Sequence, residues 1–273
     1  MIDHSVYLSI LIPTYERKDY LIRCLNSIDH YEEVEVIISD NASSYNISEC
    51  IPDHLKNICT IRRNLENIGP RENIFQASFL PNGRYTLYLT DDDYLLPGEL
   101  PLLIRKLRNS DVKVFYASCI VELVKSRRCK YYGGLPSFLG RAGLIARSHV
   151  LSGLVVRTDF LKHLLEIYPD ILRTTWYFSV AIACGSPDDA WQMEDRPILM
   201  HTWENETFWG IDSGDHKTLR ESECELYDFM WEEGLINTFQ RSFLRFQTSR
   251  LGILLVAAMH KVNRQLKAGK YDA

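Results

Sequence analysis

The chain has 273 residues, of which 46% are hydrophobic and 25% charged, and its formal net charge at pH 7 is −5. This composition excludes a disordered or collagen-like chain and leaves room for one large domain with an appendage. The negative charge argues against nucleic-acid binding by the protein as a whole.

The cysteines and the N-terminus indicate a reducing compartment. The seven Cys are scattered without a CxxC pair, so neither a disulfide framework nor a zinc site is expected. The first residues have no basic start and their apolar run stops at Pro13, unlike a secretory signal peptide. No apolar run approaches the ~18 residues of a spanning helix. We therefore expect a cytoplasmic protein.

Strands and helices alternate through the first third of the chain. Residues 6–12, VYLSILI, read as a strand buried on both faces, and residues 19–28 have helical spacing of apolar side chains. Residues 34–38 form the next strand, parallel to the first because such crossovers are right-handed. The pattern then predicts a short helix, a strand, a turn-rich loop, a helix and a strand, at 47–56, 58–62, 64–71, 71–80 and 84–90.

Polar clusters follow three of these strands. They are Thr14 with Glu16 and Arg17, Asp40 with Asn41, and the acid run Asp91–Asp93. Ligands of parallel sheets bind beyond the carboxyl ends of the strands, so these clusters should converge. Adjacent acids are costly to bury without a cation, and Mg²⁺ is commonly held by one or two carboxylates with substrate phosphates. The alternative is a solvated acidic turn.

Four segments in this order carry a family resemblance: ILIPTYER, VIISDNAS, NLENIG and GRYTLYLTDDDYLLPG. Over roughly residues 6–105 they resemble the nucleotide-sugar half of the inverting glycosyltransferases of family 2. The resemblance implies an α/β fold of the GT-A type, a Rossmann-like, mixed but mainly parallel sheet flanked by helices. We expect this domain at 1–215, with a donor half at 1–110, an acceptor half at 111–215 and a C-terminal helical extension at 216–273.

The resemblance also implies a donor site. Residues after the first strand face the base and ribose, Asp40 binds the pyrimidine edge, and the loop Asn67–Arg71 closes over the base. The implied donor-binding residues are Pro13, Thr14, Tyr15, Glu16, Asp40, Asn41, Asn67, Arg71, Asp91 and Asp92.

The acidic motif departs from the family's common D-x-D-D form. Alignment on Pro97 puts Thr90 where the first Asp usually stands. The resemblance then implies Asp91 near the ribose and Asp92 as the main ligand of Mn²⁺ or Mg²⁺, which neutralises the departing diphosphate. Asp93 is expected to be a second metal ligand, an outer-shell partner or a helix cap.

The catalytic base is harder to place. An inverting transferase needs a carboxylate to deprotonate the acceptor hydroxyl. The family's Glu-Asp pair would fall near Thr174 and Thr175, which cannot serve. We favour Asp170, then Asp188 or Asp189, each of which could equally be a solvated loop acid. Glu194-Asp195 matches the pair in letters but precedes a predicted strand at 197–199.

The acceptor half carries further candidates. A helix is predicted at 99–109, a strand at 112–124 and a mobile loop or plain surface connection at 126–143. Ser152 and Gly153 resemble the family's small-residue position at the acceptor pocket. Four more side chains could approach phosphate or sugar or be merely structural: His149, His201, Trp203 and Asn205.

The C-terminal segment 237–273 has seven basic residues and one acid, Asp272. Its apolar stretch 251–259 suits a basic amphipathic helix on an anionic membrane. The alternative is a helix packed on the catalytic domain or on a second subunit of a homo-oligomer.

Together these features predict a metal-dependent inverting glycosyltransferase. Its donor would be a nucleoside-diphosphate sugar, with UDP favoured, and its acceptor a saccharide or lipid-linked saccharide in polysaccharide synthesis. It would be cytoplasmic, with a peripheral place on the inner membrane face if the tail binds lipid. Two rival hypotheses stay open: a sugar-phosphate nucleotidyltransferase and a non-catalytic nucleotide-sugar-binding module.

Overall fold

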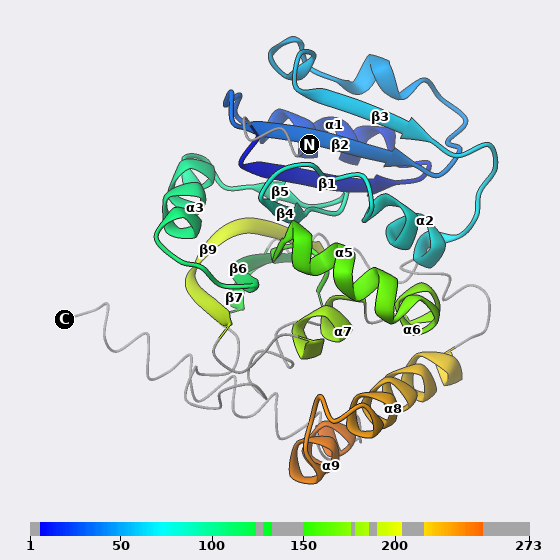
Figure 1. Cartoon of the computed structure of the whole chain (residues 1–273). Helices are drawn as coiled ribbons and strands as arrows, with labels where there is room; N and C mark the ends of the chain where they lie inside the picture. Colours follow the sequence, from blue (N-terminus) through cyan, green and yellow to red (C-terminus); the bar gives the residue numbers. More distant parts are fainter. Residues whose placement is uncertain are drawn as a thin grey trace.

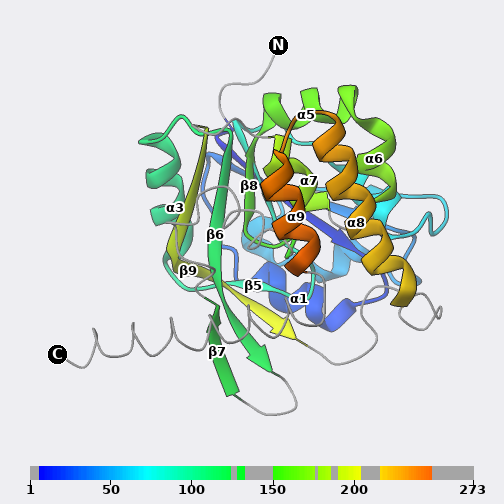
Figure 2. The ribbon, with the colours of Figure 1, turned by 90° about the horizontal axis from the view of Figure 1, so that it is seen from below.

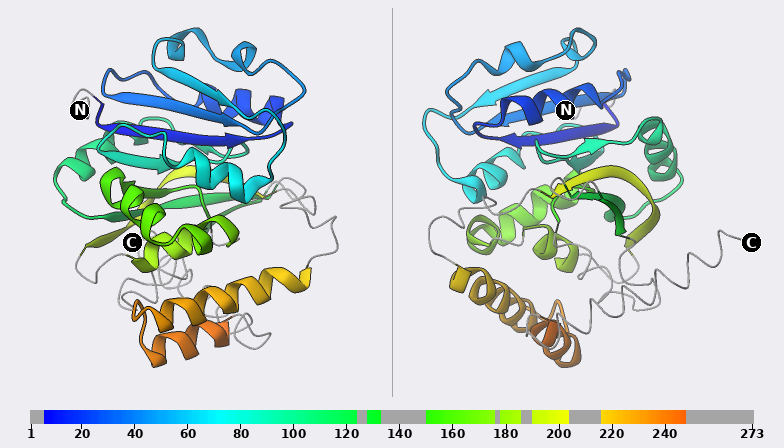
Figure 3. Two further views of the ribbon diagram at one scale, coloured as in Figure 1. Left: turned by 45° about the vertical axis from the view of Figure 1, so that its right-hand side comes forward. Right: turned by 180° about the vertical axis from the view of Figure 1, so that it is seen from behind.

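The computed structural model describes residues 6–123, 128–132, 150–175, 178–185, 190–203 and 216–247. In this part of the chain one twisted sheet carries helices on both faces (Figure 1; Figure 3). The strands lie in the order β3-β2-β1-β4-β8-β6-β9-β5, and β7 pairs with β6. Their bounds are β1 Leu8–Thr14, β2 Val34–Asp40, β3 Cys59–Arg63, β4 Tyr85–Tyr88, β5 Tyr94–Leu95, β6 Val114–Leu123, β7 Arg128–Tyr132, β8 Leu154–Arg157 and β9 Trp191–Trp203.

Strand β1 lies between two parallel neighbours, β2 and β4. Its even-numbered residues, such as Ile10, pack with α1 (Lys18–Asn26) and α3 (Glu99–Arg108). Leu11 faces the other way, toward α2 (Pro70–Ala77) and α5 (Thr158–Ile167). Burial on both faces explains the unbroken apolar run, since each fully buried Leu or Ile contributes about 1.5–3 kcal/mol.

The remaining strands make the sheet mixed. β8 runs antiparallel to β4 and β6, β9 is parallel to β6, and the short β5 is antiparallel to β9. In Figure 2 the β6–β7 hairpin projects beyond the rest of the sheet. The predicted mixed, mainly parallel α/β architecture with a helical extension is confirmed.

Two local predictions were wrong. The short helix near 47–56 is two 3₁₀ turns, Ile47–Cys50 and Asp53–Leu55, because Pro52 lacks the N–H that a continuous helix needs. Residues 128–132 of the predicted loop form β7, whose backbone pairs with β6. Farther along the chain, helix α6 spans Pro169–Thr174 and helix α7 spans Phe178–Gly185.

The C-terminal helices α8 (His216–Glu232) and α9 (Thr238–Gln247) lie together at the end of the molecule farthest from β3 (Figure 1). Leu226 and Met230 pack with Ile171 of α6 and Ala181 of α7. Asp228 accepts from two arginines of α9, Arg241 and Arg245. Helix α9, the described part of the basic segment, therefore packs on α8, while 248–273 lie outside the described residues. None of the described helices has the length and apolarity to cross a membrane.

Candidate active site at the strand ends

A cavity of about 350 Å³ lies beyond the carboxyl ends of β1, β2 and β4. Each of the three polar clusters contributes residues to this cavity, as the parallel topology predicts, although some members of each cluster lie outside it. Its lining comes from the turn after β1, the end of β2, helix α2 with its preceding loop, and the turn that contains Asp91, Asp92 and Asp93, here called the acid turn. The lining residues are Pro13, Thr14, Tyr15, Arg17, Asn41, Asn67, Pro70, Asn73, Ile74, Thr90, Asp91 and Asp92.

Asp91 is the first acid of the turn and is buried against the end of β1. Thr14 Oγ1 donates to Asp91 Oδ2 at 2.7 Å, and Arg17 Nη1 lies 3.4 Å from Asp91 Oδ1. Burial and the charge of Asp92 raise the pKa of Asp91 to about 7, although Arg17 and Thr14 oppose this shift.

The two carboxylate oxygens of Asp92 differ, because one accepts a hydrogen bond and the other, here called the orphaned oxygen, does not. Oδ2 accepts from Arg17 Nη1 at 2.9 Å, whereas Oδ1 is buried and has no hydrogen-bond partner. Burial and the neighbouring charge of Asp93 raise the pKa of Asp92. A buried carboxylate oxygen without a donor is expensive unless a positive group completes it. The residue therefore fits a ligand of Mg²⁺ or Mn²⁺, which proteins often hold through one carboxylate while substrate phosphates supply the rest.

Asp93 points away from the cavity and is fully buried. Its carboxylate accepts from the Thr202 backbone N–H at 2.9 Å and from Thr90 Oγ1 at 3.0 Å, and His201 Nδ1 lies 3.0 Å away. Burial disfavours the charged imidazole, but the hydrogen bond and charge of Asp93 outweigh it and raise the pKa of His201. These contacts favour the supporting role of Asp93 over that of a metal ligand. Among the described residues, no three acidic, His or Cys side chains form a ready-made metal cluster.

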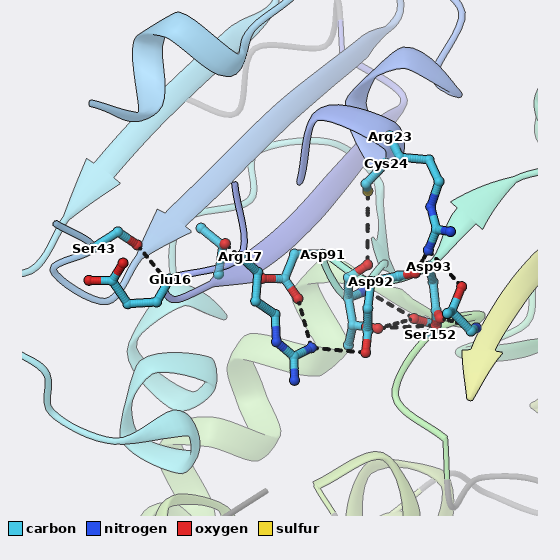
Figure 4. Close-up of polar contacts among 12 residues, drawn as sticks. Glu16, Arg17, Arg23, Cys24, Ser43, Asp91, Asp92, Asp93 and Ser152 are labelled. Carbon is cyan, nitrogen blue, oxygen red and sulfur yellow. Dashed lines mark hydrogen bonds and ion pairs between the residues drawn. The ribbon is translucent and has the colours of Figure 1, made fainter. Parts of the chain in front are cut away.

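Arg23 braces the acid turn from behind, a role that the sequence did not reveal. Its Nη2 donates to the Asp92 carbonyl at 2.6 Å and to Thr202 Oγ1 at 2.7 Å. The guanidinium also lies over the rings of Tyr94 and Tyr20, at 4.7 and 5.3 Å from their centroids. Figure 4 shows Arg23 and Arg17 approaching the turn from opposite sides. Only three-dimensional proximity joins α1 to β9, so no local motif could have shown this contact.

The β2 end of the cavity is lined by amides. Asn41 is buried, accepts from Asn64 Nδ2 and the Ile68 N–H at 3.0 Å each, and donates to Asn67 Oδ1 at 2.7 Å. This network fixes the loop before α2 against the end of β2. Asn41 and Asn67 thus lie where the sequence predicted a base-binding loop.

Asp40 is not part of the cavity lining. It is fully buried, and its carboxylate accepts from the Ser43 N–H at 2.9 Å and from Arg63 at 2.8 Å. The structure gives this carboxylate a structural role in the turn after β2. Its predicted contact with a pyrimidine would require these partners to move.

Two other predicted donor residues also point elsewhere. Glu16 bonds to the Ser44 backbone N–H at 2.6 Å and to the Ser44 hydroxyl at 2.9 Å. Arg71 donates to the Thr174 carbonyl at 2.6 Å, which joins α2 to α6. Neither residue lines the cavity, whereas Tyr15 does and is 42% exposed.

The candidate bases and acceptor-site residues differ in where they lie and in whether the structure describes them. Asp170 is exposed in the first turn of α6 and does not line the cavity, although the other end of α6 contacts Arg71. Glu194 lies in β9 and pairs with Lys106 of α3. Four candidates lie outside the described residues, namely His149, Asp188, Asp189 and Asn205, and nothing is described of the side chains of Asp195 and Trp203.

Ser152 holds the start of the acid turn. Its hydroxyl accepts from the Thr90 N–H at 2.9 Å and lies 2.8 Å from Thr90 Oγ1. The next residue, Gly153, has φ +91°, and a Cβ there would lie 3.0 Å from the Ala117 carbonyl oxygen. The small-residue position predicted for the acceptor pocket thus serves to bring β8 against the acid turn.

The chain is similar in sequence to known glycosyltransferases. Over 103 residues the chain is 39% identical to an abequosyltransferase, RfbV, of Salmonella typhimurium, a match that covers 35% of this chain and 31% of the relative. It is 29% identical over 120 residues to the GalNAc(5)-diNAcBac-PP-undecaprenol beta-1,3-glucosyltransferase of Campylobacter jejuni, covering 42% and 38%. The matches span about a third of the length of these curated relatives.

Solved structures share the fold across most of the chain. S. aureus TarS 1-349 in complex with UDP-GlcNAc has a TM-score of 0.66 at 15% identity, covering 89% of this chain and 71% of that one. The mannosyltransferase PcManGT of Pyrobaculum calidifontis, in complex with GDP-Man and Mn²⁺, has a TM-score of 0.58 at 12% identity, covering 95% and 77%. The model of the family described as glycosyl transferase family 2 matches residues 9–153, more than half of the chain. The chain belongs to glycosyl transferase family 2.

Proposed function

We propose that this protein transfers a sugar from a nucleoside-diphosphate sugar to a saccharide hydroxyl and inverts the anomeric carbon. The observation that carries the proposal is the chemistry of the cavity wall. Asparagine amides and the exposed ring of Tyr15 lie toward β2, and the carboxylates of Asp91 and Asp92 lie beyond the end of β4. An aromatic ring and amides suit a nucleobase. Carboxylates with an arginine beside them suit a ribose and a diphosphate with its counter-ion.

Different residues of the cavity would bind different parts of the donor. Tyr15, Asn41 and Asn67 would hold the base, and Asp91 would accept from the ribose hydroxyls. Asp92 would hold Mn²⁺ or Mg²⁺ through its orphaned oxygen. The chemistry supplied by a cation held there would be stabilisation of the charge that develops on the leaving diphosphate.

Asp170 remains our candidate for the base on the acceptor side. It would take the proton of the acceptor hydroxyl while that oxygen attacks the anomeric carbon from the face opposite the diphosphate. The new glycosidic bond forms as the bond to the diphosphate oxygen breaks, and the nucleoside diphosphate leaves. Because Asp170 does not line the cavity, this role requires the acceptor to bridge α6 and the donor site.

The relatives indicate the biosynthetic setting. One is named for an undecaprenol-linked acceptor and another is a poly(ribitol-phosphate) beta-glucosyltransferase of Bacillus spizizenii. We infer an acceptor of this kind, a lipid-linked saccharide or surface polymer, reached at the inner face of the cytoplasmic membrane. The basic segment 237–273 would supply the membrane contact, and deleting it should abolish co-sedimentation with anionic liposomes.

A nucleotide screen tests the donor proposal. Thermal unfolding would be followed with UDP, GDP, CDP and their sugars, with and without Mn²⁺. We expect one nucleoside diphosphate to raise the melting temperature only when Mn²⁺ is present, and its sugar to be hydrolysed or transferred. Binding without hydrolysis or transfer to any acceptor would instead favour the non-catalytic module.

A further inference from the structure

Arg17 is the positive group closest to the carboxylates of the cavity. Its Nη1 lies 2.9 Å from Asp92 Oδ2 and 3.4 Å from Asp91 Oδ1, so one guanidinium bridges both acids (Figure 4). The two carboxylates are almost fully buried, whereas the Arg17 side chain is 33% exposed and lines the cavity. In the structure, therefore, the protein itself supplies one positive charge to the two carboxylates on the cavity side of the acid turn.

The backbone before Arg17 is fixed so that the side chain is aimed at the acids. Glu16 adopts φ +55°, a left-handed conformation that is uncommon for this residue type. The Glu16 N–H donates to Ser43 Oγ at 3.0 Å, and its carboxylate accepts from Ser44. These bonds join the turns after β1 and β2. Arg17 follows directly and takes the N-cap position of α1, without a capping bond from its side chain.

This placement conflicts with a divalent cation bound to the same acids. Arg17 keeps its charge at any physiological pH, so it cannot be neutralised to make room. A cation held by Asp92 would lie close to the guanidinium and be repelled by it. Because the side chain reaches the acids from the open cavity, it can leave them without any change in the backbone. A diphosphate offers it a new partner, since guanidinium groups bind phosphate oxygens with matched geometry.

We propose that Arg17 and the divalent cation are alternative counter-ions of Asp91 and Asp92, and that Arg17 transfers to the donor diphosphate when the cation binds. The inference rests on the proposed function, because it describes how the proposed donor site binds the cation and the nucleoside diphosphate. It has a thermodynamic consequence: the cation alone binds weakly, and the cation and nucleoside diphosphate each strengthen binding of the other.

The experiment compares the wild-type chain with Arg17→Gln and Arg17→Lys. Mn²⁺ affinity is measured by electron paramagnetic resonance of free Mn²⁺, alone and with the tightest binder among UDP, CDP and GDP. In the wild type the nucleotide should tighten Mn²⁺ binding at least tenfold. Arg17→Gln should bind Mn²⁺ alone about tenfold more tightly, bind the nucleotide about tenfold more weakly at saturating Mn²⁺, and lose most of the coupling. Arg17→Lys keeps a positive charge on a smaller group, so its affinities for Mn²⁺ and nucleotide should lie between those of the wild type and Arg17→Gln.

Arg196→Gln is the matched control. Arg196 bonds to the buried carboxylate of Glu99 at 2.6 Å, outside the cavity, so its removal also strips an arginine from a buried acid. Mn²⁺ should raise the melting temperature of Arg17→Gln more than that of the wild type or Arg196→Gln. The melting temperature also reports on folding. If the unpaired acids destabilise Arg17→Gln, Mn²⁺ should restore its melting temperature.

The outcomes separate the two ideas. If the wild type binds no nucleoside diphosphate at any Mn²⁺ concentration, the proposed function fails. If it binds the pair, but neither Arg17 variant binds Mn²⁺ alone more tightly than the wild type, the inference fails and the proposed function stands. Equal stabilisation of Arg17→Gln and Arg196→Gln by Mn²⁺ would also overturn the inference.

Discussion

The contact between Arg23 and the acid turn gives the sharpest test of how the site is supported. Replacing Arg23 with Met keeps most of the aliphatic stem and removes the guanidinium. The change deletes the bonds to the Asp92 carbonyl and Thr202 Oγ1, at 2.6 and 2.7 Å, and the contacts with two tyrosine rings. Hydrogen bonds from a charged donor contribute about 1.5–3 kcal/mol and a cation over a ring about 0.5–2 kcal/mol.

We expect Arg23→Met to lower the free energy of unfolding by about 3 kcal/mol, measured by urea denaturation. The looser turn should also weaken Mn²⁺-dependent nucleotide binding, because Asp92 is held through its own carbonyl. Arg84→Met is the control. Arg84 pairs with Asp111 at 3.1 Å on the surface, where such pairs are worth at most about 1 kcal/mol. If Arg23→Met lost no more stability than Arg84→Met, the bracing role would be refuted.

Four further predictions concern the same region. Asp92→Ala should abolish Mn²⁺-dependent transfer while thermal unfolding shows an intact fold, and full activity would refute the metal-ligand assignment. Asp170→Asn should lower kcat by about 10²–10⁴-fold with donor affinity unchanged, whereas Glu166→Gln in the preceding helix should not; equal rates would exclude Asp170 as the base. Gly153→Ala should lower stability by about 1–3 kcal/mol in urea denaturation, because φ is +91° and the new Cβ would lie 3.0 Å from the Ala117 carbonyl oxygen. Without metal, the raised pKa of Asp91, about 7 in the folded state, means that folding takes up a proton between about pH 4 and pH 7. The unfolding free energy should therefore fall as pH rises through that window, and Asp91→Asn should make this slope shallower, leaving the part that comes from the raised pKa of Asp92.

The sequence predicted the strand ends well because the physics there is local and topological. An apolar run such as 6–12 must be buried on both faces, and parallel strands bring their carboxyl ends to one edge. Thr14, Asn41, Asp91 and Asp92 therefore meet at the cavity as expected.

What the sequence missed depends on contacts between distant segments. Asp40 was expected to meet a base, but Arg63 of the neighbouring strand takes its carboxylate. The functions of Arg17 and Arg23 depend on where α1 lies relative to the acid turn, some 70 residues along the chain. Glu16 turns toward Ser44 because its backbone is left-handed, which no motif shows.

The departure from the family's acidic motif also has a physical explanation in the contacts of Thr90. Its backbone N–H donates to Ser152, as that of any residue except proline could, but its side-chain hydroxyl donates to Asp93 at 3.0 Å, where an ionised aspartate side chain could only accept. A carboxylate at this position would face the fully buried carboxyl group of Asp93 and could offer it no hydrogen-bond donor.

Thr90 therefore adds a hydroxyl donor to Asp93, whose other partners are the Thr202 backbone N–H and His201. Asp91 is secured by Thr14, on the strand next to β4. Asp92 alone keeps a buried oxygen without a donor, and it lies on the cavity wall. Three adjacent acids thus acquire three environments, and the one left incomplete is the one best suited to a cation brought by the donor.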